Sequence, residues 1–143
     1  HDAYFTVDRA FMPVVTGGMN STLRDAARCA LMIRDEGEAK NSQIIPSGWI
    51  KSAFNVSEKL KLNMDSNPNY GDESWEAYHN MWWILDSAKE EFCATGIHGQ
   101  VIYINKAKNT VMVWYSNQPG AAAPRNINYQ SKLMAARALV DSL

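Results

Sequence analysis

The sequence has few residues that bind metals or form cross-links. Cysteine occurs twice and histidine three times among 143 residues. No histidine lies at zinc-ligand spacing from a cysteine, a second histidine or a carboxylate, so we expect no metal site and no cofactor. Two cysteines are too few for a disulfide framework. Cys29 and Cys93 have apolar neighbours and are expected to be small core residues, although a bridge between them stays open.

Net charge and long apolar runs are also scarce. The formal net charge is −1, which argues against nucleic acid as a partner. No run approaches the roughly 18 apolar residues that a transmembrane helix needs. No signal peptide opens the chain, so we expect a soluble protein, cytoplasmic or periplasmic, without a membrane partner. His1 is not an ordinary initiator residue, and we expect the chain to begin at a cut or a processed end.

The composition that remains is typical of a globular domain with helices. Hydrophobic residues make up 46% and charged residues 20% of the sequence. Apolar residues recur at helical spacing after Thr22 and Asp25, which resemble a capping box, and Gly37 is expected to end this helix. A second, shorter helix is predicted after Pro46. A third, amphipathic helix at the C-terminus is predicted by the apolar residues Tyr129, Leu133, Ala136, Val140 and Leu143.

Strand patterns appear in the second half of the chain. Residues 81–85, 101–104 and 111–115 are predicted strands, and a hairpin-length connection joins the last two. They are apolar on both faces, which indicates a sheet covered on each side. The C-terminal helix would cover one face, and residues 20–55 or a segment outside this chain would cover the other. The predicted class is α+β, with an antiparallel meander and helices against it. The polar residues 57–77 are predicted to form a long surface loop that could carry function.

A search for catalytic groups is mostly negative. A serine nucleophile needs a base within hydrogen-bond reach, yet the chain holds no Gly-x-Ser-x-Gly elbow and no Ser-x-x-Lys. No paired-carboxylate site stands out. Asp35-Glu36 and Glu90-Glu91 are expected to be solvated charges at the ends of elements.

The most informative segment is 95–100, with the sequence Thr-Gly-Ile-His-Gly-Gln. Two glycines beside a strand indicate a bulge or a close approach by a ligand or another backbone. Backbone N–H groups at such an edge can stabilise the negative charge that develops on a bound carbonyl oxygen. A plain β-bulge is the alternative. His98 either lines a pocket or is an interior histidine bonded to a backbone carbonyl.

Strand periodicity places the two indoles of Trp82 and Trp83 on opposite faces of the sheet. One of them is a candidate pocket wall because it lies near a glycine-rich strand. Core packing is the alternative for both.

Four segments occur in an order that resembles a known family. They are 17–28 (Gly-Gly-Met-Asn-Ser-Thr-Leu-Arg-Asp-Ala-Ala-Arg), 44–49 (Ile-Ile-Pro-Ser-Gly-Trp), Trp82-Trp83 and 96–100 (Gly-Ile-His-Gly-Gln). This series resembles the C-terminal portion of class C β-lactamase-like serine hydrolases, in the branch of 6-aminohexanoate-dimer hydrolases and carboxylesterases. The resemblance implies that residues 1–143 form a single partial domain, the C-terminal portion of the β-lactamase and penicillin-binding-protein-like fold.

The resemblance also implies where the active site is divided. The family's Ser-x-x-Lys and its Tyr-x-Asn-type motif would lie before His1, and Tyr115-Ser116-Asn117 and Tyr78-His79-Asn80 are interpreted as chance matches because their order is wrong. Ala94 stands where a β-lactamase has lysine, which argues against penicillin hydrolysis and for an esterase or amidase. The backbone N–H of Ile97 would be an oxyanion donor. The substrate pocket would be lined by Trp83, Thr95, Gly96, His98, Gly17 and Gly18.

The function expected from this resemblance is hydrolysis of small esters or linear amides through an acyl-enzyme. The chain alone is expected to be inactive, because the nucleophile would come from a missing N-terminal segment, its main partner. The alternative is a stand-alone binding or interaction module that reuses this half of the fold without catalysis. An uncovered sheet face would favour self-association through exposed apolar surface.

Overall fold

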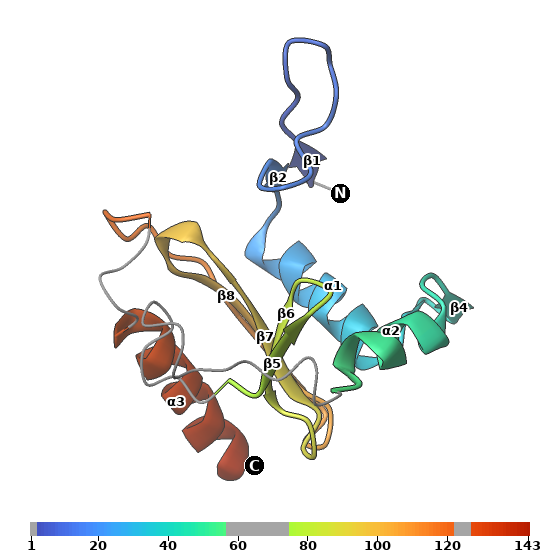
Figure 1. Ribbon diagram of the computed structural model, residues 1–143, viewed down its shortest axis with the longest axis vertical. Coiled ribbons are helices and arrows are strands. Elements are labelled where there is room, and N and C mark those ends of the chain that lie inside the picture. Colours follow the sequence, from blue (N-terminus) through green and yellow to red (C-terminus); the bar gives the residue numbers. More distant parts are fainter. Residues whose placement is uncertain (1–2, 57–74, 122–126) are drawn as a thin grey trace.

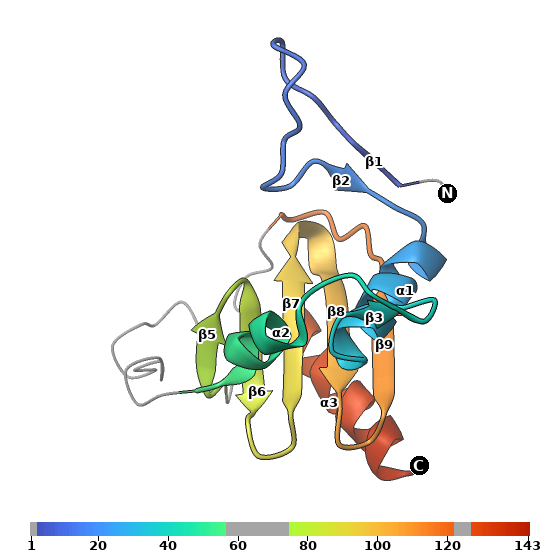
Figure 2. The same ribbon diagram turned by 90° about the vertical axis from the view of Figure 1, so that its right-hand side faces the viewer.

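The computed structural model describes residues 3–56, 75–121 and 127–143, with side chains in the last range from residue 131. Its centre is a five-stranded antiparallel sheet in which strands that follow one another in the chain are neighbours (Figures 1 and 2). The strands are β5 (Ala77–His79), β6 (Trp82–Asp86), β7 (Glu91–Gly96), β8 (Gln100–Asn105) and β9 (Thr110–Trp114). The predicted antiparallel sheet with a C-terminal helix is confirmed. The predicted loop at 57–77 lies mostly outside the described residues.

Tight turns explain why the sheet is a simple meander. Asn80 and Met81 join β5 to β6, with φ values of 47° and 70°. Two consecutive residues with positive φ match the twist of a two-residue hairpin. Glu90 and Asn109 adopt positive φ at the ends of the next loops, β6–β7 and β8–β9. Each connection therefore returns the chain directly beside the strand it has just left.

The sequence did not reveal β7, although it lies at the centre of the sheet. Its residues pair with β6 on one side and with β8 along the whole strand on the other. The interpretation of Glu91 as a solvated charge was wrong, because this side chain is only 2% exposed. An acidic first residue, together with the small Ala94 and Gly96 near the end, concealed a strand whose centre is apolar.

Helix α1 (Leu23–Arg34) begins and ends at the residues that the sequence indicated. The Asp25 N–H donates to Thr22 Oγ1 over 3.1 Å, which satisfies one of the unpaired amides of the first turn. Gly37 follows the helix with a φ of 90°, and its N–H donates to the Met32 carbonyl over 2.8 Å. This left-handed conformation is the usual place for glycine after a helix.

In the part of the chain that the structure describes, helices cover both faces of the sheet (Figures 1 and 2). Helices α1 and α2 (Ser47–Phe54) lie on one face, and α3 (Ile127–Asp141) lies on the other. The expectation that residues 20–55 cover the second face is thus confirmed. Leu133, Ala136 and Val140 of α3 are buried as predicted, whereas Leu143 lies beyond the helix and is exposed. The side chain of Tyr129 lies outside the described residues.

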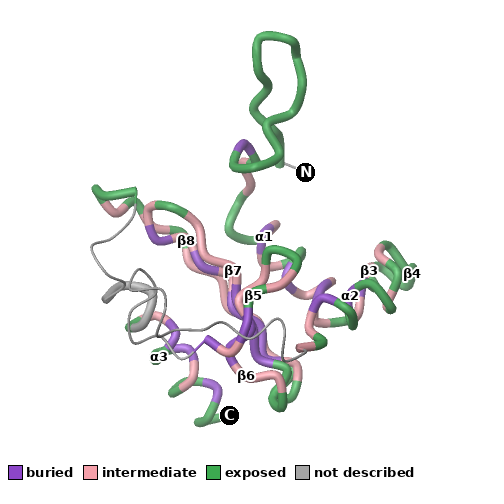
Figure 3. The backbone as a smooth tube through the Cα atoms, in the orientation of Figure 1, coloured by how far each residue is buried: buried purple, intermediate pink, exposed green. Residues whose placement is uncertain are grey.

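Buried positions lie on the strands and on the helices that cover the sheet (Figure 3), and the core consists of two apolar layers, one on each side of the sheet. The layer under α1 and α2 contains Ala30, Ile33, Ile50, Ala77, Ile84, Phe92 and Ile104. The layer under α3 contains Trp75, Leu85, Cys93, Val101, Tyr103, Leu133, Ala136 and Val140. Because Cys29 is exposed on α1 and Cys93 is buried under α3, the two thiols lie on opposite sides of the sheet and form no bridge.

Residues 3–20 form an arm that projects away from the sheet (Figures 1 and 2). Its base is the pair β1 (Tyr4–Phe5) and β2 (Met19–Asn20). The arm carries most of its apolar side chains in solvent, and Phe11 is 83% exposed. A second small hairpin, β3 (Glu38–Ala39) with β4 (Ser42–Gln43), follows α1. Exposed apolar side chains therefore lie on the arm, and others lie elsewhere on the described surface, such as Trp49, Met81 and Met134. Self-association stays a prediction.

No helix in the described ranges is long and apolar enough to span a bilayer.

Candidate functional site

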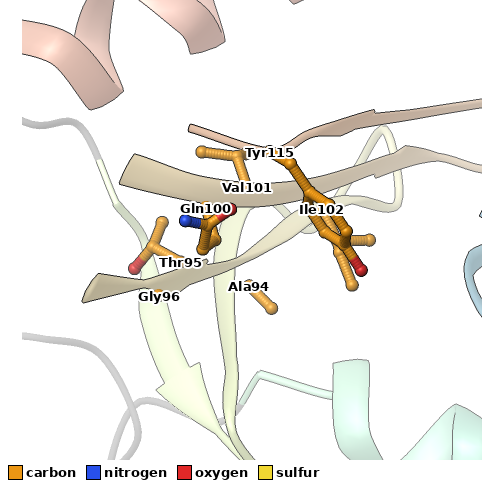
Figure 4. A pocket seen from close by; sticks show the side chains of 7 residues that line it. All are labelled: Ala94, Thr95, Gly96, Gln100, Val101, Ile102 and Tyr115. Atoms are coloured by element: carbon orange, nitrogen blue, oxygen red, sulfur yellow. The ribbon is translucent and has the colours of Figure 1, made fainter. Parts of the chain in front are cut away.

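A small pocket lies where β7 ends and β8 begins (Figure 4). Its volume is about 230 Å³, and apolar atoms form nearly all of its lining. The residues that line it are Ala94, Thr95, Gly96, Gln100, Val101, Ile102 and Tyr115. Thr95 and Gly96, both predicted from the sequence as substrate-binding residues, are therefore brought together here. Ala94 lies beside them, opposite Ile102 in the β7–β8 ladder.

Glycine at position 96 lets the Gln100 side chain cross the strand end. Gly96 pairs with Gln100, and a Cβ on Gly96 would lie 3.2 Å from the Gln100 Cβ. The Gln100 amide donates from Nε2 to the Ser116 carbonyl over 2.5 Å, and its Oε1 accepts the Ser116 N–H over 3.0 Å. These two bonds imitate a backbone pair and continue the β8–β9 ladder past Trp114. The pocket edge is therefore held by a side chain in place of a strand.

The segment from Ile97 to Gly99 is a 3₁₀ turn at the mouth of the pocket. His98 and Gly99 have φ values of 59° and 84°, so the chain reverses sharply into β8. A Cβ on Gly99 would lie 2.5 Å from Gln118 Nε2. Lys132 of α3 donates from Nζ to the Gly99 carbonyl over 2.6 Å and so anchors the turn. Ile97, which follows the lining residue Gly96, is 66% exposed.

His98 is bonded to backbone, as one of its two interpretations stated. Its Nδ1 lies 2.8 Å from the Gln118 carbonyl oxygen. Its N–H donates to the Ala121 carbonyl over 3.0 Å, and its carbonyl accepts the Gln118 N–H over 3.2 Å. His98 does not line the pocket. It ties the turn to the segment that leads toward α3.

Trp82 and Trp83 lie on opposite faces of the sheet, as strand periodicity predicted. The Trp83 ring lies 4.0 Å from the Trp75 centroid and 4.4 Å from the Tyr78 centroid, in the layer under α3. The Trp82 ring packs edge-on against Phe54 in the other layer. Neither indole lines the pocket, so the structure does not bring Trp83 together with Thr95 and Gly96.

Gly17 and Gly18 lie at the base of the arm and not in the pocket. The Gly18 N–H donates to the Val14 carbonyl over 2.7 Å, and its own carbonyl accepts the Thr6 N–H over 2.8 Å. A Cβ on Gly18 would overlap Thr6 Oγ1 and the Val14 carbonyl oxygen, so only glycine fits. A Cβ on Gly17 would meet nothing, and the structure gives no reason for glycine there.

Tyr115 also lines the pocket, although its Tyr-x-Asn motif was interpreted as a chance match. Its hydroxyl lies 2.5 Å from Ser21 Oγ, at the base of the arm. The hairpin that places Tyr115 beside β8 was predicted from the sequence, but the contact with Ser21 came only from the structure. No lining residue carries a charge. Among the described residues, no group of three or more His, Cys, Asp or Glu side chains could hold a metal ion.

Known proteins resemble this chain in sequence and in fold. No family model matches it. A curated relative, the 6-aminohexanoate-dimer hydrolase of Paenarthrobacter ureafaciens, is 27% identical over 118 residues, which are 82% of this chain and 30% of the relative. A solved chain from Bacillus anthracis, provisionally named a 6-aminohexanoate-dimer hydrolase, matches with a TM-score of 0.73 and 25% identity, over 99% of this chain and 34% of its own. The chain thus spans about a third of each relative's length. The similarity to 6-aminohexanoate-dimer hydrolases that the four sequence segments indicated is confirmed by both comparisons.

Proposed function

We propose that this chain supplies one pocket wall and an oxyanion donor to the active site of a serine hydrolase with the β-lactamase and penicillin-binding-protein-like fold. The observation that carries the proposal is the end of β7, where Ala94, Thr95 and Gly96 line an uncharged pocket and lead directly into the exposed Ile97. The names of both relatives, which are hydrolases, support the same class of chemistry.

The chemistry is acyl transfer from a small ester or linear amide. A serine would attack the carbonyl carbon, and the carbonyl oxygen would gain negative charge as the tetrahedral intermediate forms. Preorganised N–H donors stabilise that charge, and the Ile97 N–H is the donor that this chain offers. Ala94 gives the site no lysine beside the bound acyl group, which disfavours penicillins.

The nucleophile is proposed to lie outside these 143 residues. They contain no Ser-x-x-Lys, and a serine hydroxyl without an adjacent base is a weak nucleophile. The working protein would combine this chain with an upstream segment that carries serine, lysine and tyrosine. By itself the chain would bind but not turn over substrate.

The test replaces Ile97 by proline, which removes the backbone N–H. Proline at position 97 has no N–H, and Gly96 has φ −124° and ψ 162°, which a residue before proline adopts readily. Because the Ile97 side chain is 66% exposed, the matched control Ile97→Ala keeps the N–H at small cost. The full reading frame that contains this chain is assayed with p-nitrophenyl acetate and butyrate. In Ile97→Pro we expect kcat to fall about 10²–10³-fold with KM nearly unchanged, the cost of one oxyanion donor.

Two results would contradict the proposal. Equal kcat values in Ile97→Pro and Ile97→Ala would remove Ile97 as an oxyanion donor. Turnover by the isolated chain, with stoichiometric labelling of one of its own serines by a fluorophosphonate, would place the nucleophile within these residues.

A further inference from the structure

Tyr115 lines the pocket (Figure 4), and three contacts fix its position. Its predecessor Trp114 is paired with Val101 in the sheet. The backbone of its successor Ser116 is bonded on both sides by the Gln100 amide, over 2.5 and 3.0 Å. Its hydroxyl lies 2.5 Å from Ser21 Oγ, across 94 residues of sequence. The ring is therefore held at its backbone and at its tip.

Ser21 is itself in a fixed place. It follows β2, in which Asn20 pairs with Tyr4, and it precedes Thr22, whose Oγ1 accepts the Asp25 N–H at the start of α1. The hydrogen bond to Tyr115 therefore joins the base of the arm to the end of the sheet. A hydroxyl bonded at this point has much less freedom to swing into solvent than an isolated tyrosine, although the residue is 47% exposed.

The pocket that Tyr115 borders suits an uncharged chain. Its ring is the largest side chain of the lining, and the other lining residues carry no charge. Placing a charged group there would remove water from the charge without a described partner to replace it, which is costly. An alkyl chain gives up no hydrogen bonds to water when it enters such a site. An aromatic ring at the border of the pocket then sets how far the chain can extend.

We propose that Tyr115, held by Ser21, is the residue that limits the length of the uncharged acyl group accepted by this pocket. The proposal rests on the proposed function, because an acyl group is bound here only if the pocket serves acyl transfer. Tyr115 is a specificity-determining residue in this scheme, and Ser21 is its positioning residue.

The test measures acyl-chain preference in the full reading frame that contains this chain. The substrates are p-nitrophenyl acetate, butyrate, hexanoate and octanoate. The variants are Tyr115→Ala, Tyr115→Phe, Ser21→Ala and the double variant that combines Tyr115→Phe with Ser21→Ala. Tyr115→Ala removes the wall, so the octanoate-to-butyrate ratio of kcat/KM is expected to rise about tenfold or more, the effect of one or more methylenes in an apolar pocket. Tyr115→Phe and Ser21→Ala both break the hydrogen bond between the two side chains. Each should raise the octanoate-to-butyrate ratio by the same amount, and by less than Tyr115→Ala does. Their double variant should add nothing further.

A control separates loss of an exposed aromatic ring from loss of Tyr115. Phe11, 83% exposed on the arm, is replaced by alanine and should leave the acyl-chain profile unchanged. An unchanged profile in Tyr115→Ala would overturn the proposal. A wild-type profile in Ser21→Ala, with a changed profile in Tyr115→Phe, would overturn the role of Ser21.

A separate readout keeps this proposal distinct from the proposed function. If no variant, nor the wild type, hydrolyses any ester, the proposed function fails. Butanol, hexanol and octanol are then titrated while the amide NMR shifts of Thr95, Gly96 and Gln100 are followed. Octanol that shifts these amides only in Tyr115→Ala would support Tyr115 as the wall. The same shifts in wild type and variant would overturn it.

Discussion

The carboxylate of Glu91 and the guanidinium of Arg137 form a two-bond ion pair between the central strand and α3. Arg137 donates from Nε to Oε1 over 2.7 Å and from Nη2 to Oε2 over 3.0 Å. Tyr103 also donates its hydroxyl to Glu91 Oε1, over 2.9 Å. Burial raises the pKa of Tyr103, and the nearby Glu91 charge raises it further, so this hydroxyl keeps its proton. Glu91 is 2% exposed, and these bonds replace the water it has lost.

We predict that Arg137→Met destabilises the chain. Methionine keeps much of the apolar stem, but the buried carboxylate of Glu91 loses two charge-assisted bonds and keeps the one from Tyr103. The free energy of unfolding should fall by about 3–5 kcal/mol, the cost of removing one partner from a buried ion pair. Urea denaturation followed by tryptophan fluorescence measures it. The matched control is Arg28→Met, which breaks a pair with Asp25 in which the Arg28 side chain is 63% exposed. Its cost should stay below about 1 kcal/mol, and equal losses in the two variants would contradict the role assigned to burial.

Two glycines should respond oppositely to alanine. Gly37 has a φ of 90°, and a Cβ there would overlap the backbone carbonyl of Ile45. Gly37→Ala should therefore lower the free energy of unfolding by more than about 1 kcal/mol. Gly48 lies in α2, where a Cβ meets nothing within 4 Å. Gly48→Ala should raise the free energy of unfolding by about 0.5–1 kcal/mol. Thermal melts of both variants in one buffer measure the effect. A shift of the melting temperature in the same direction for both variants would refute the geometric argument.

Acid should weaken the ion pair between Glu36, which follows α1, and Lys106, which follows β8. Hydrogen bonds from Lys51 and then Lys106 lower the pKa of Glu36, with Nζ–Oε distances of 3.0 and 3.2 Å. A carboxyl whose pKa is lowered by folding binds protons more readily in the unfolded chain. Its contribution to stability is present above the ordinary pKa of glutamate and is lost as the pH falls through the lower, folded value.

The variant Glu36→Gln isolates this contribution. Between about pH 5 and pH 3 the free energy of unfolding of the wild type should fall more steeply than that of Glu36→Gln. The difference at neutral pH should stay below about 1 kcal/mol, because the Lys51 side chain is 62% exposed and Lys106 keeps Glu90 as a second carboxylate partner. Parallel curves for the two proteins across this pH range would show that Glu36 is not linked to folding.

Much of the fold follows from local patterns. The start and end of α1, the face of α3 that is buried and most of β6, β8 and β9 were all predicted from spacing and caps. The strand β7 was not, because Glu91 is buried only after Arg137 and Tyr103 reach it from other elements. A charged residue next to a loop carries no local sign that it will find such partners.

The residues that the sequence proposed for a site do not all lie together in the structure. Thr95 and Gly96 line the pocket, and the interpretation of His98 as bonded to a backbone carbonyl matches its contact with Gln118. Trp83 packs under α3 with Trp75 and Tyr78 instead of lining the pocket. Its alternation between faces was correct, but alternation does not say which face holds the pocket.

The sequence by itself determined the start and end of α1, the buried face of α3 and most of β6, β8 and β9, because each depends on residues a few positions apart. Only the tertiary structure decided that Ser21 meets Tyr115 across 94 residues, and that Glu91 meets Arg137 across 46. The order of strands in the sheet and the faces taken by the helices set both contacts. That order depends on how apolar surfaces are shared among distant segments, and no short stretch of sequence contains it.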